Sequence, residues 1–269
     1  MDLGLKGARV VVTGGASGIG LAVAKAFAAE GADAAIWDLS PDTEARAEEV
    51  SREFGARAIG RVVDVTDRDA VRAAFEDAET RLGHIDHVVH SAARGSGKFG
   101  FPFLRLEPSD WPRVLEVNVM GMVNVAHQAA PALIRRRSGS MTFIASVAGQ
   151  IGSQTDPPYS ASKAANINFA QCMAKDLAPH GVRVNTVCPG MVKTPLNHGI
   201  WRAWNDGQPD AEKVDYETWS AEKIRKVVPL GTWQSASDVA NMVVFLGSAR
   251  ASQITGQTIN VDGGFVMHW

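Results

Sequence analysis

Short apolar runs alternate with longer stretches in which apolar residues recur every three or four positions. An apolar run bounded by turn residues is typical of a buried strand, and the wider spacing is typical of an amphipathic helix. The apolar runs predict strands over Lys6–Thr13, Asp33–Trp37, Arg57–Asp64, His87–Ser91, Ser140–Ala145 and Arg183–Cys188. The helical pattern covers Leu21–Glu30, Asp42–Phe54, Asp67–Leu82, Trp111–Arg137, Ser160–Ala178 and Ala236–Gly247. This alternation predicts an α/β fold with a doubly wound parallel sheet and helices on both faces.

Length and composition fit one such unit. The chain has 269 residues, of which 45% are hydrophobic, so it can bury one large core. We therefore expect residues 1–269 to form a single domain. A net charge of −2 argues against a nucleic-acid partner, because such proteins carry a strongly basic face.

The cysteine count and the lengths of the apolar runs bear on the cellular location of the protein. Two cysteines, Cys172 and Cys188, do not suggest a disulfide framework. No apolar run approaches the roughly 20 residues of a membrane span, and the first residues lack a signal-peptide pattern. We expect a cytoplasmic protein without a membrane partner.

A glycine-rich turn joins the first predicted strand to the first helix. It reads Thr13-Gly-Gly-Ala-Ser-Gly-Ile-Gly20. Glycines let the backbone approach a pyrophosphate, and the free N–H groups at the start of a helix bind the anion. A plain strand–turn–helix with flexible glycines is the alternative, but this context favours a dinucleotide site. The residues expected to hold the coenzyme here are Gly14, Ser17, Gly18, Ile19 and Gly20.

The second predicted strand ends at Asp38. An acidic residue about 20 positions past the glycine-rich turn is expected to bond the ribose hydroxyls of NAD. Its charge would repel the 2′-phosphate of NADP, and neither Ser17 nor Leu39 is the basic residue that NADP favours. The sequence therefore predicts NAD as the coenzyme, with Asp38 and Leu39 beside its adenosine ribose.

Tyr159 and Lys163 stand one helical turn apart, and Ser146 lies upstream. Residues at i and i+4 share a helix face, so the two side chains reach the same place. A neighbouring ammonium lowers the pKa of a phenol, which then gives or takes a proton near neutral pH. The Ser146 hydroxyl can bond the same substrate oxygen. A Tyr-x-x-x-Lys pair alone is common on surface helices, so the other motifs must support it.

Three histidines, His84, His87 and His90, resemble a metal cluster by spacing alone. Positions three apart in a strand point to opposite faces, so His87 and His90 diverge. We expect no metal site.

With the glycine-rich turn, Asp38 and the Tyr159–Lys163 pair, the sequence resembles the short-chain dehydrogenase/reductase family. The resemblance covers essentially the whole chain. The family motif Thr-Gly-x-x-x-Gly-x-Gly is met in full. The resemblance implies a single-domain Rossmann fold and a catalytic tetrad of Asn118, Ser146, Tyr159 and Lys163. Asn118 is expected to hold a water that links Lys163 to solvent. The last strand lies within 254–264 by the same likeness.

The family likeness adds further coenzyme contacts. Asp64 and Val65 resemble the pair at the adenine, and the segment 189–194 resembles the one that holds the nicotinamide, through Pro189, Gly190, Val192 and Thr194. Lys163 and Tyr159 also face the nicotinamide ribose. The family usually has Asn-Asn-Ala-Gly after the fourth strand, whereas this chain has His90-Ser91-Ala92-Ala93. The departure leaves open how the ribose is braced, although Ser91 and Ala92 are still placed beside the coenzyme.

The least regular stretch, about 195–228, matches the family's substrate loop, a flexible lid over the site. Its tryptophans Trp201 and Trp204 are candidates for substrate contact, and packing within a two-helix excursion is an equal alternative. The substrate residues expected are thus Ser146, Gln150, Tyr159, Trp201 and Trp204. Phe99, Phe101, Phe103 and Gln154 are further candidates for the border of the pocket.

The predicted function is an NAD(H)-dependent oxidoreductase that interconverts a secondary alcohol and a ketone, on a small cyclic or polyhydroxylated substrate. Alternatives within the family are a 3-oxoacyl thioester reductase and an epimerase or dehydratase of nucleotide-sugars. A coenzyme-sensing regulator is the alternative that is not an enzyme. The family commonly forms homo-tetramers, and the apolar tail 265–269 suggests a buried interface.

Overall fold

The computed structural model describes residues 2–98, 103–153 and 156–267. One seven-stranded parallel sheet runs through it in the order β3-β2-β1-β4-β5-β6-β7. The strands are β1 (Arg9–Thr13), β2 (Asp33–Asp38), β3 (Ala58–Val62), β4 (His87–His90), β5 (Gly139–Ile144), β6 (Val182–Pro189) and β7 (Thr258–Val261). The predicted α/β fold is confirmed.

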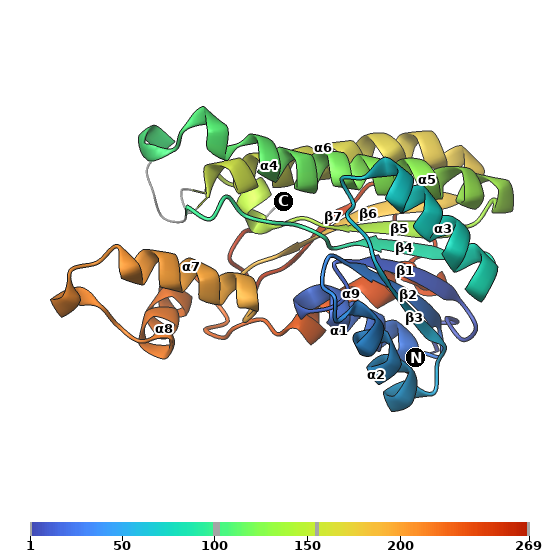
Figure 1. Ribbon diagram of the computed structural model, residues 1–269, viewed down its shortest axis with the longest axis horizontal. Helices are drawn as coiled ribbons and strands as arrows, with labels where there is room; N and C mark the ends of the chain where they lie inside the picture. The colour runs from blue at the N-terminus through green and yellow to red at the C-terminus, as the bar shows by residue number, and fades with distance from the viewer. Residues whose placement is uncertain (1, 99–102, 154–155, 268–269) are drawn as a thin grey trace.

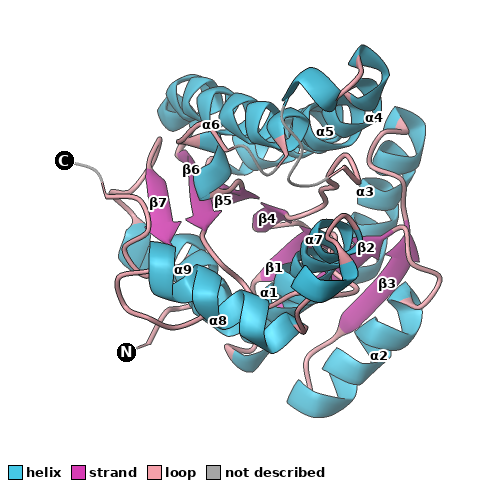
Figure 2. Ribbon diagram, turned by 90° about the vertical axis from the view of Figure 1, so that its left-hand side faces the viewer, coloured by secondary structure: helices cyan, strands magenta, loops and turns pink. Residues whose placement is uncertain are grey.

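Helices cover both faces of the sheet, as Figures 1 and 2 show. One layer holds α3 (Arg68–Leu82), α5 (Gly121–Arg136) and α6 (Pro157–Leu177), and the other holds α1 (Gly18–Ala29), α2 (Thr43–Phe54) and α9 (Ala236–Gly247). The short helix α4 (Pro112–Leu115) precedes α5. The helices α7 (Pro195–Asp206) and α8 (Tyr216–Val227) project beyond one edge of the sheet (Figure 1), and residues 195–228 are called the lid below.

The strands form because β-branched residues alternate between the two helical layers. Val11 packs into the core shared with α3, α5 and α6, while its neighbours Val10 and Val12 pack into the core shared with α1 and α9. All three valines are fully buried. Full burial of each such side chain contributes about 1.5–3 kcal/mol, so the central strands anchor both layers.

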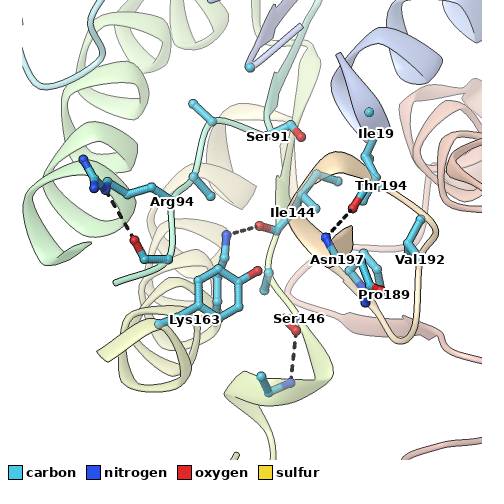
Figure 3. Close-up of a pocket in the computed structure, with 18 of the residues that line it drawn as sticks. Ile19, Ser91, Arg94, Ile144, Ser146, Lys163, Pro189, Val192, Thr194 and Asn197 are labelled. Carbon is cyan, nitrogen blue, oxygen red and sulfur yellow. Dashed lines mark hydrogen bonds between the residues drawn. The ribbon is translucent and has the colours of Figure 1, made fainter. Parts of the chain in front are cut away.

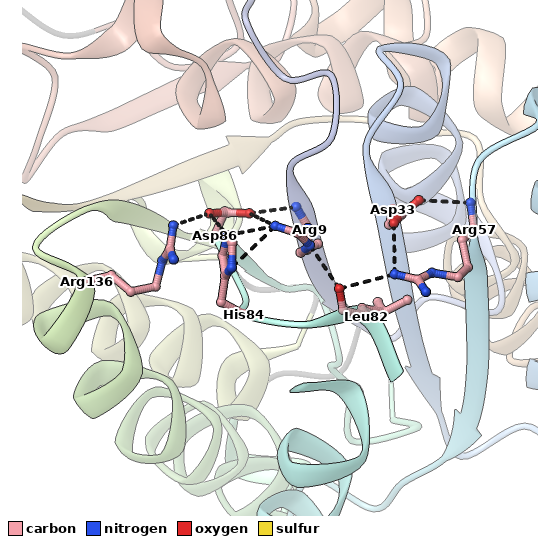
Figure 4. A network of polar contacts seen from close by, with 7 residues as sticks. All are labelled: Arg9, Asp33, Arg57, Leu82, His84, Asp86 and Arg136. Carbon is pink, nitrogen blue, oxygen red and sulfur yellow. Dashed lines mark hydrogen bonds and ion pairs between the residues drawn. The ribbon is translucent and has the colours of Figure 1, made fainter. Parts of the chain in front are cut away.

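A polar network fastens the amino-terminal edge of the sheet (Figure 4). The Asp86 carboxylate accepts hydrogen bonds from the Arg9 backbone at 2.9 Å and from the Arg136 guanidinium at 3.0 Å. Arg9 also donates to the Leu82 carbonyl at 2.9 Å. These contacts tie β1 to the ends of α3 and α5, so the opposite, carboxyl edge is the one left for loops that carry chemistry.

The long helix predicted over 111–137 is interrupted. Between α4 and α5, residues Glu116–Met120 form a π-helical turn, and Asn118 lies in its middle. The lid forms two helices, in agreement with the two-helix alternative given for this stretch. None of the helices in the described part of the chain is long and apolar enough to cross a membrane.

Candidate active site

The candidate site lies where the strand order reverses, at the carboxyl ends of β1 and β4. In open α/β sheets this reversal creates a crevice for ligands. A cavity of about 530 Å³ is found there, lined by the loops that follow β1 through β6 and by parts of the lid. Every predicted coenzyme and catalytic residue except Asn118 lines it.

The glycine-rich turn forms one wall because no side chain fits in it. A Cβ on Gly20 would lie 2.0 Å from the Gly14 carbonyl oxygen, and a Cβ on Gly14 would lie 2.7 Å from the Ala92 nitrogen. Gly14 and Gly18 have positive φ angles of 65° and 53°, which L-residues rarely adopt. The Ser17 side chain does not cap α1, so the first backbone N–H groups of this helix are free to bind an anion.

Asp38 ends β2 at the rim of the cavity. Its two carboxylate oxygens accept hydrogen bonds from the backbone of Ala16 and of Ser40, each at 3.0 Å. The carboxylate is therefore fixed against the glycine-rich turn. Leu39 beside it is 58% exposed and contributes an apolar surface.

Asp64 and Val65 line the cavity after β3. The Asp64 carboxylate accepts from the Thr66 backbone at 2.9 Å and from its hydroxyl at 2.7 Å, and lies 3.5 Å from the Arg113 guanidinium. Burial raises the pKa of this carboxyl, but the Thr66 and Arg113 contacts outweigh it, so the pKa lies below its usual value. Arg113 itself is paired with Glu116 at 2.7 Å.

The sequence His90-Ser91-Ala92 is braced through Thr13. The His90 ring shares a hydrogen bond with the Thr13 hydroxyl at 2.9 Å, and the Ala92 backbone donates to the same oxygen at 3.3 Å. His90 Nε2 is buried without a partner among the described residues. Burial lowers the pKa of His90 to about 3, helped by the nearby Lys163 charge, so the ring is neutral.

The three catalytic candidates come from two segments that meet. Ser146 begins the short turn Val147–Gly149 and accepts from the Ala148 backbone at 3.1 Å. Tyr159 lies in the first turn of α6, and Lys163 lies one turn later. Figure 3 shows the Lys163 ammonium directed at the Ile144 carbonyl, to which it donates at 2.7 Å. Its nitrogen is 5.4 Å from the centre of the Tyr159 ring.

Burial dominates the acid–base properties of this pair. It raises the pKa of the Tyr159 phenol above its ordinary value, which the Ser146 hydrogen bond partly opposes. It lowers the pKa of Lys163 to about 8. The net lowering of the phenol pKa expected from Lys163 is not seen, because burial of the phenol outweighs the contacts that lower its pKa. Tyr159 is therefore protonated at neutral pH.

Asn118 braces the site from behind. Its side-chain oxygen accepts from the Arg94 backbone at 2.8 Å, and its side-chain nitrogen donates to the Arg94 carbonyl at 3.0 Å and to the Ser162 hydroxyl at 2.8 Å. Its backbone carbonyl accepts from Asn166 at 2.8 Å. Asn118 thus joins the loop after β4 to α6, beside both Tyr159 and Lys163.

The segment after β6 forms the wall opposite the glycine-rich turn. Pro189, Gly190, Val192 and Thr194 all line the cavity, and Figure 3 shows Thr194 at the start of α7, where its hydroxyl accepts from the Asn197 backbone at 3.5 Å. A Cβ on Gly18 would lie 3.8 Å from the Thr194 methyl group. The two walls therefore come close to each other at this point of the cavity.

The tryptophans expected to contact substrate pack elsewhere. Trp201 lies against Tyr216, with ring centres 5.7 Å apart, and Trp204 lies against Trp219 at 6.3 Å. Neither belongs to the described cavity lining. Gln150 is also absent from that lining; its amide pairs with the Asn260 amide at 2.7 Å. Phe99, Phe101 and Gln154 lie outside the described residues.

Other side chains take their place at the cavity. From the lid come Asn197, Ile200 and Lys223, and Asp156, Arg94 and Phe265 also belong to the lining. The Asp156 carboxylate accepts from the backbones of Ser96 at 2.8 Å and Tyr159 at 3.4 Å, so it positions the start of α6. Asp156 could have been predicted from the sequence, because a polar residue just before a helix is typical of a helix cap. No local sequence pattern predicts that the lid residues line the cavity.

Comparison with known proteins gives the family. The profile described as "Enoyl-(Acyl carrier protein) reductase" matches residues 14–266. The 3-oxoacyl-(acyl-carrier-protein) reductase FabG of Thermotoga maritima is 32% identical over 263 residues, which cover 98% of this chain and 99% of that one. The chain belongs to the short-chain dehydrogenase/reductase family.

Two other relatives show the breadth of the short-chain dehydrogenases. The 2-(S)-hydroxypropyl-CoM dehydrogenase 3 of Xanthobacter autotrophicus is 34% identical, covering 97% of both chains. The crystal structure of L-sorbose reductase from Gluconobacter frateurii, in complex with NADPH and L-sorbose, matches with a TM-score of 0.91 and 28% identity over 100% of both chains. The protein is an oxidoreductase of this family.

The family uses a nicotinamide cofactor, and the residues of this chain fit one. The glycine-rich turn can fold this tightly at the cavity wall only because Gly14 and Gly20 carry no Cβ. Asp38, Asp64, Tyr159 and Thr194 line one continuous cavity that leads from the adenosine end to the catalytic groups.

The buried neutral His90 predicts acid sensitivity. In the unfolded chain its pKa is near 6.5, and in the folded protein it is about 3, so the unfolded state binds the extra proton between these values. Stability is therefore lost as the pH falls below 6.5, by about 2 kcal/mol at pH 5. His90→Asn should remove that part of the loss, measured by urea unfolding at pH 7 and pH 5. His127→Asn, on the exposed face of α5, is the control and should behave as wild type. An equal acid loss in His90→Asn would refute the assignment.

Proposed function

We propose that the protein is an NAD(H)-dependent oxidoreductase that interconverts a secondary alcohol and a ketone. The observation that carries this proposal is the protonated Tyr159, hydrogen-bonded to Ser146 and backed by Lys163 in one cavity with the dinucleotide-binding turn. A bound nicotinamide would supply the hydride for the carbonyl carbon. The residues of the chain do the remaining work.

In the reducing direction, the Tyr159 phenol donates its proton to the carbonyl oxygen. The Ser146 hydroxyl donates a hydrogen bond to the same oxygen and so orients and polarises the carbonyl. The Lys163 ammonium contributes positive charge that stabilises the phenolate left behind. Burial of these groups excludes water, which strengthens each electrostatic contact. The oxidation of an alcohol follows the same path in reverse.

Asn118 acts in this proposal as a positioning residue. Its hydrogen bonds to Arg94 and Ser162 hold the cavity loop and α6 together. Asn118 is also proposed to hold the water that links Lys163 to solvent. Lys163 and Thr194 are proposed to contact the coenzyme through its ribose and carboxamide.

The choice of NAD over NADP rests on Asp38. Its fixed carboxylate faces the cavity beside Leu39, and Arg113, the nearby cation at the Asp64 loop, is already paired. A 2′-phosphate near Asp38 would meet like charge without compensation. L-sorbose reductase is described with NADPH, so this chain is proposed to differ from that neighbour in coenzyme.

A 3-oxoacyl thioester reductase is the second candidate, favoured by the identity to FabG of Thermotoga maritima. A small polyhydroxylated substrate is favoured by the likeness to L-sorbose reductase. An assay of NADH consumption with small ketones and with 3-oxoacyl thioesters separates the two. No turnover of either class would contradict the proposal and leave a coenzyme-sensing protein. We also propose a cytoplasmic location, consistent with the net charge and the absence of spanning helices among the described residues.

Tyr159→Phe should lower kcat by about a hundredfold to ten-thousandfold, because removal of the hydroxyl removes the proton donor. The dissociation constant for NADH should be unchanged. The chain contains two tyrosines, and Tyr216→Phe is the matched control: its hydroxyl bonds Asn197 at 3.1 Å within the lid. Steady-state kinetics and a coenzyme titration measure both effects. Near-normal kcat in Tyr159→Phe would remove the phenol from the mechanism.

Wild-type kcat/KM should be about tenfold or more higher with NADH than with NADPH. Asp38→Ala should lower this NADH-to-NADPH ratio by about tenfold, because loss of the carboxylate removes about 1.4 kcal/mol of repulsion. Asp42→Ala, an exposed acid at the start of α2, should leave the ratio unchanged. Kinetics with both coenzymes decide this. A wild-type preference for NADPH would show that Asp38 does not face the ribose.

We propose a homo-tetramer and expect light scattering to give a mass near four times 28.7 kDa. Two surfaces support it: β7 lies at the edge of the sheet, and Leu115, Met120 and Met267 are exposed, at 37%, 50% and 74%. An unpaired strand edge and exposed apolar groups favour association. A monomer at micromolar concentration would reject this assembly.

A further inference from the structure

One lysine of the lid points into the active-site cavity. Lys223 lies in the middle of α8, far in sequence from the catalytic residues, yet it lines the same cavity as Ser146, Tyr159 and Lys163. Its ammonium sits over the Trp219 ring, 4.8 Å from the ring centre. A cation is thus held in the lining of the cavity that contains the catalytic groups.

Lys223 differs from the other lysines in or beside the lid. Lys193 pairs with Glu217 at 2.9 Å, Lys213 with Asp210 at 2.7 Å, and Lys226 with Glu222 at 2.6 Å. Lys223 forms no ion pair within the described part of the chain. Its Trp219 contact occupies one side of the ammonium, which leaves N–H donors for a ligand.

The surroundings of Lys223 make an uncompensated charge costly. Burial lowers the pKa of this lysine, and no carboxylate among the described residues offsets the effect. Asp156 lines the same cavity, but its carboxylate is occupied by the backbones of Ser96 and Tyr159. A desolvated cation without a counter-charge destabilises a fold unless a ligand supplies the charge, and such groups gather at functional sites.

Arg94 is a poorer candidate for the same task. It also lines the cavity, but Figure 3 shows its guanidinium turned away from Ser146 and Lys163, with a donor aimed at the Gly95 carbonyl at 3.4 Å. Of the other cations in the lining, Lys163 bonds the Ile144 carbonyl and Arg113 pairs with Glu116, which leaves Lys223 for a bound substrate.

We propose that Lys223 binds an anionic group of the substrate, so that the preferred substrate is a small ketone or secondary alcohol bearing a carboxylate, phosphate or sulfonate. This inference rests on the proposed function, since it assigns the substrate class of that same site. The anion completes an ion pair with Lys223 while the carbonyl oxygen meets Tyr159 and Ser146. A neutral polyol would leave the charge of Lys223 without a partner.

The test compares oxo-acids with their neutral amides, which match them in size. The probes are 2-oxobutanoate, 3-oxobutanoate and 4-oxopentanoate, each beside the corresponding amide, so that three carbonyl-to-anion separations are covered. At least one acid should have a kcat/KM about tenfold to a hundredfold above that of its amide, as expected for a charge-assisted hydrogen bond. Equal values for all three pairs in the wild type would overturn the proposal.

Three variants locate the effect. Lys223→Met keeps the apolar stem and should bring the ratio of acid to amide close to one. Lys223→Arg should retain most of the ratio. Lys226→Met, on the same helix but paired with Glu222 at the surface, should match the wild type. If Lys223→Met leaves the acid-to-amide ratio of kcat/KM unchanged, Lys223 does not contact the substrate. The same conclusion follows if the variant raises the KM for NADH equally in assays with the acid and with the amide.

A binding measurement separates this inference from the proposed reaction. Calorimetric titration of the NADH-saturated protein should show binding of the preferred acid, weaker binding of its amide, and loss of the difference in Lys223→Met. Absence of turnover with acids, amides and thioesters would refute the oxidoreductase reaction, and the titration would still decide the role of Lys223. No acid-selective binding in the wild type would overturn the anion site.

Discussion

The site depends on the close contact between α6 and the turn that follows Ser146. A Cβ on Gly149 would lie 2.6 Å from the Lys163 backbone carbon, so the helix rests directly on the turn. The Ser160 hydroxyl, next to Tyr159, donates to the Ala148 carbonyl across the same contact. Ser146 and the Tyr159–Lys163 pair belong to separate segments, and this contact fixes their mutual positions. Any larger residue at 149 would push the phenol away from the serine.

The fold was predictable because its signals are local. The apolar strands, the glycine-rich turn and the amphipathic helices each carry their pattern within a short window, and the parallel order follows from the alternation. The π-helical turn at Glu116–Met120 was not predictable. Its cause is tertiary: Asn118 bonds Arg94 and Ser162, and no local pattern in the sequence encodes those partners.

The cavity was predictable only in part, for the same reason. The coenzyme wall follows from motifs next to strand ends, and the structure brings Gly14, Asp38 and Thr194 together as the sequence indicated. The substrate wall depends on how the lid helices face each other. Trp201 and Trp204 were candidates for substrate contact, yet they pack between α7 and α8. Gln150 pairs with Asn260, which is distant in sequence.

The aromatic packing of the lid has a consequence for how this enzyme can diversify. His198 stacks on Tyr216 at 3.6 Å, and Tyr216 in turn lies against Trp219 and Trp233, so the two helices carry a small core of their own. The lid side chains that line the cavity, Asn197, Ile200 and Lys223, are few. Evolution can exchange Ile200 and Lys223 without disturbing the proton donor, whereas Asn197 also bonds the Tyr216 hydroxyl inside the lid. Substrate range and chemical step are thereby inherited as separable traits.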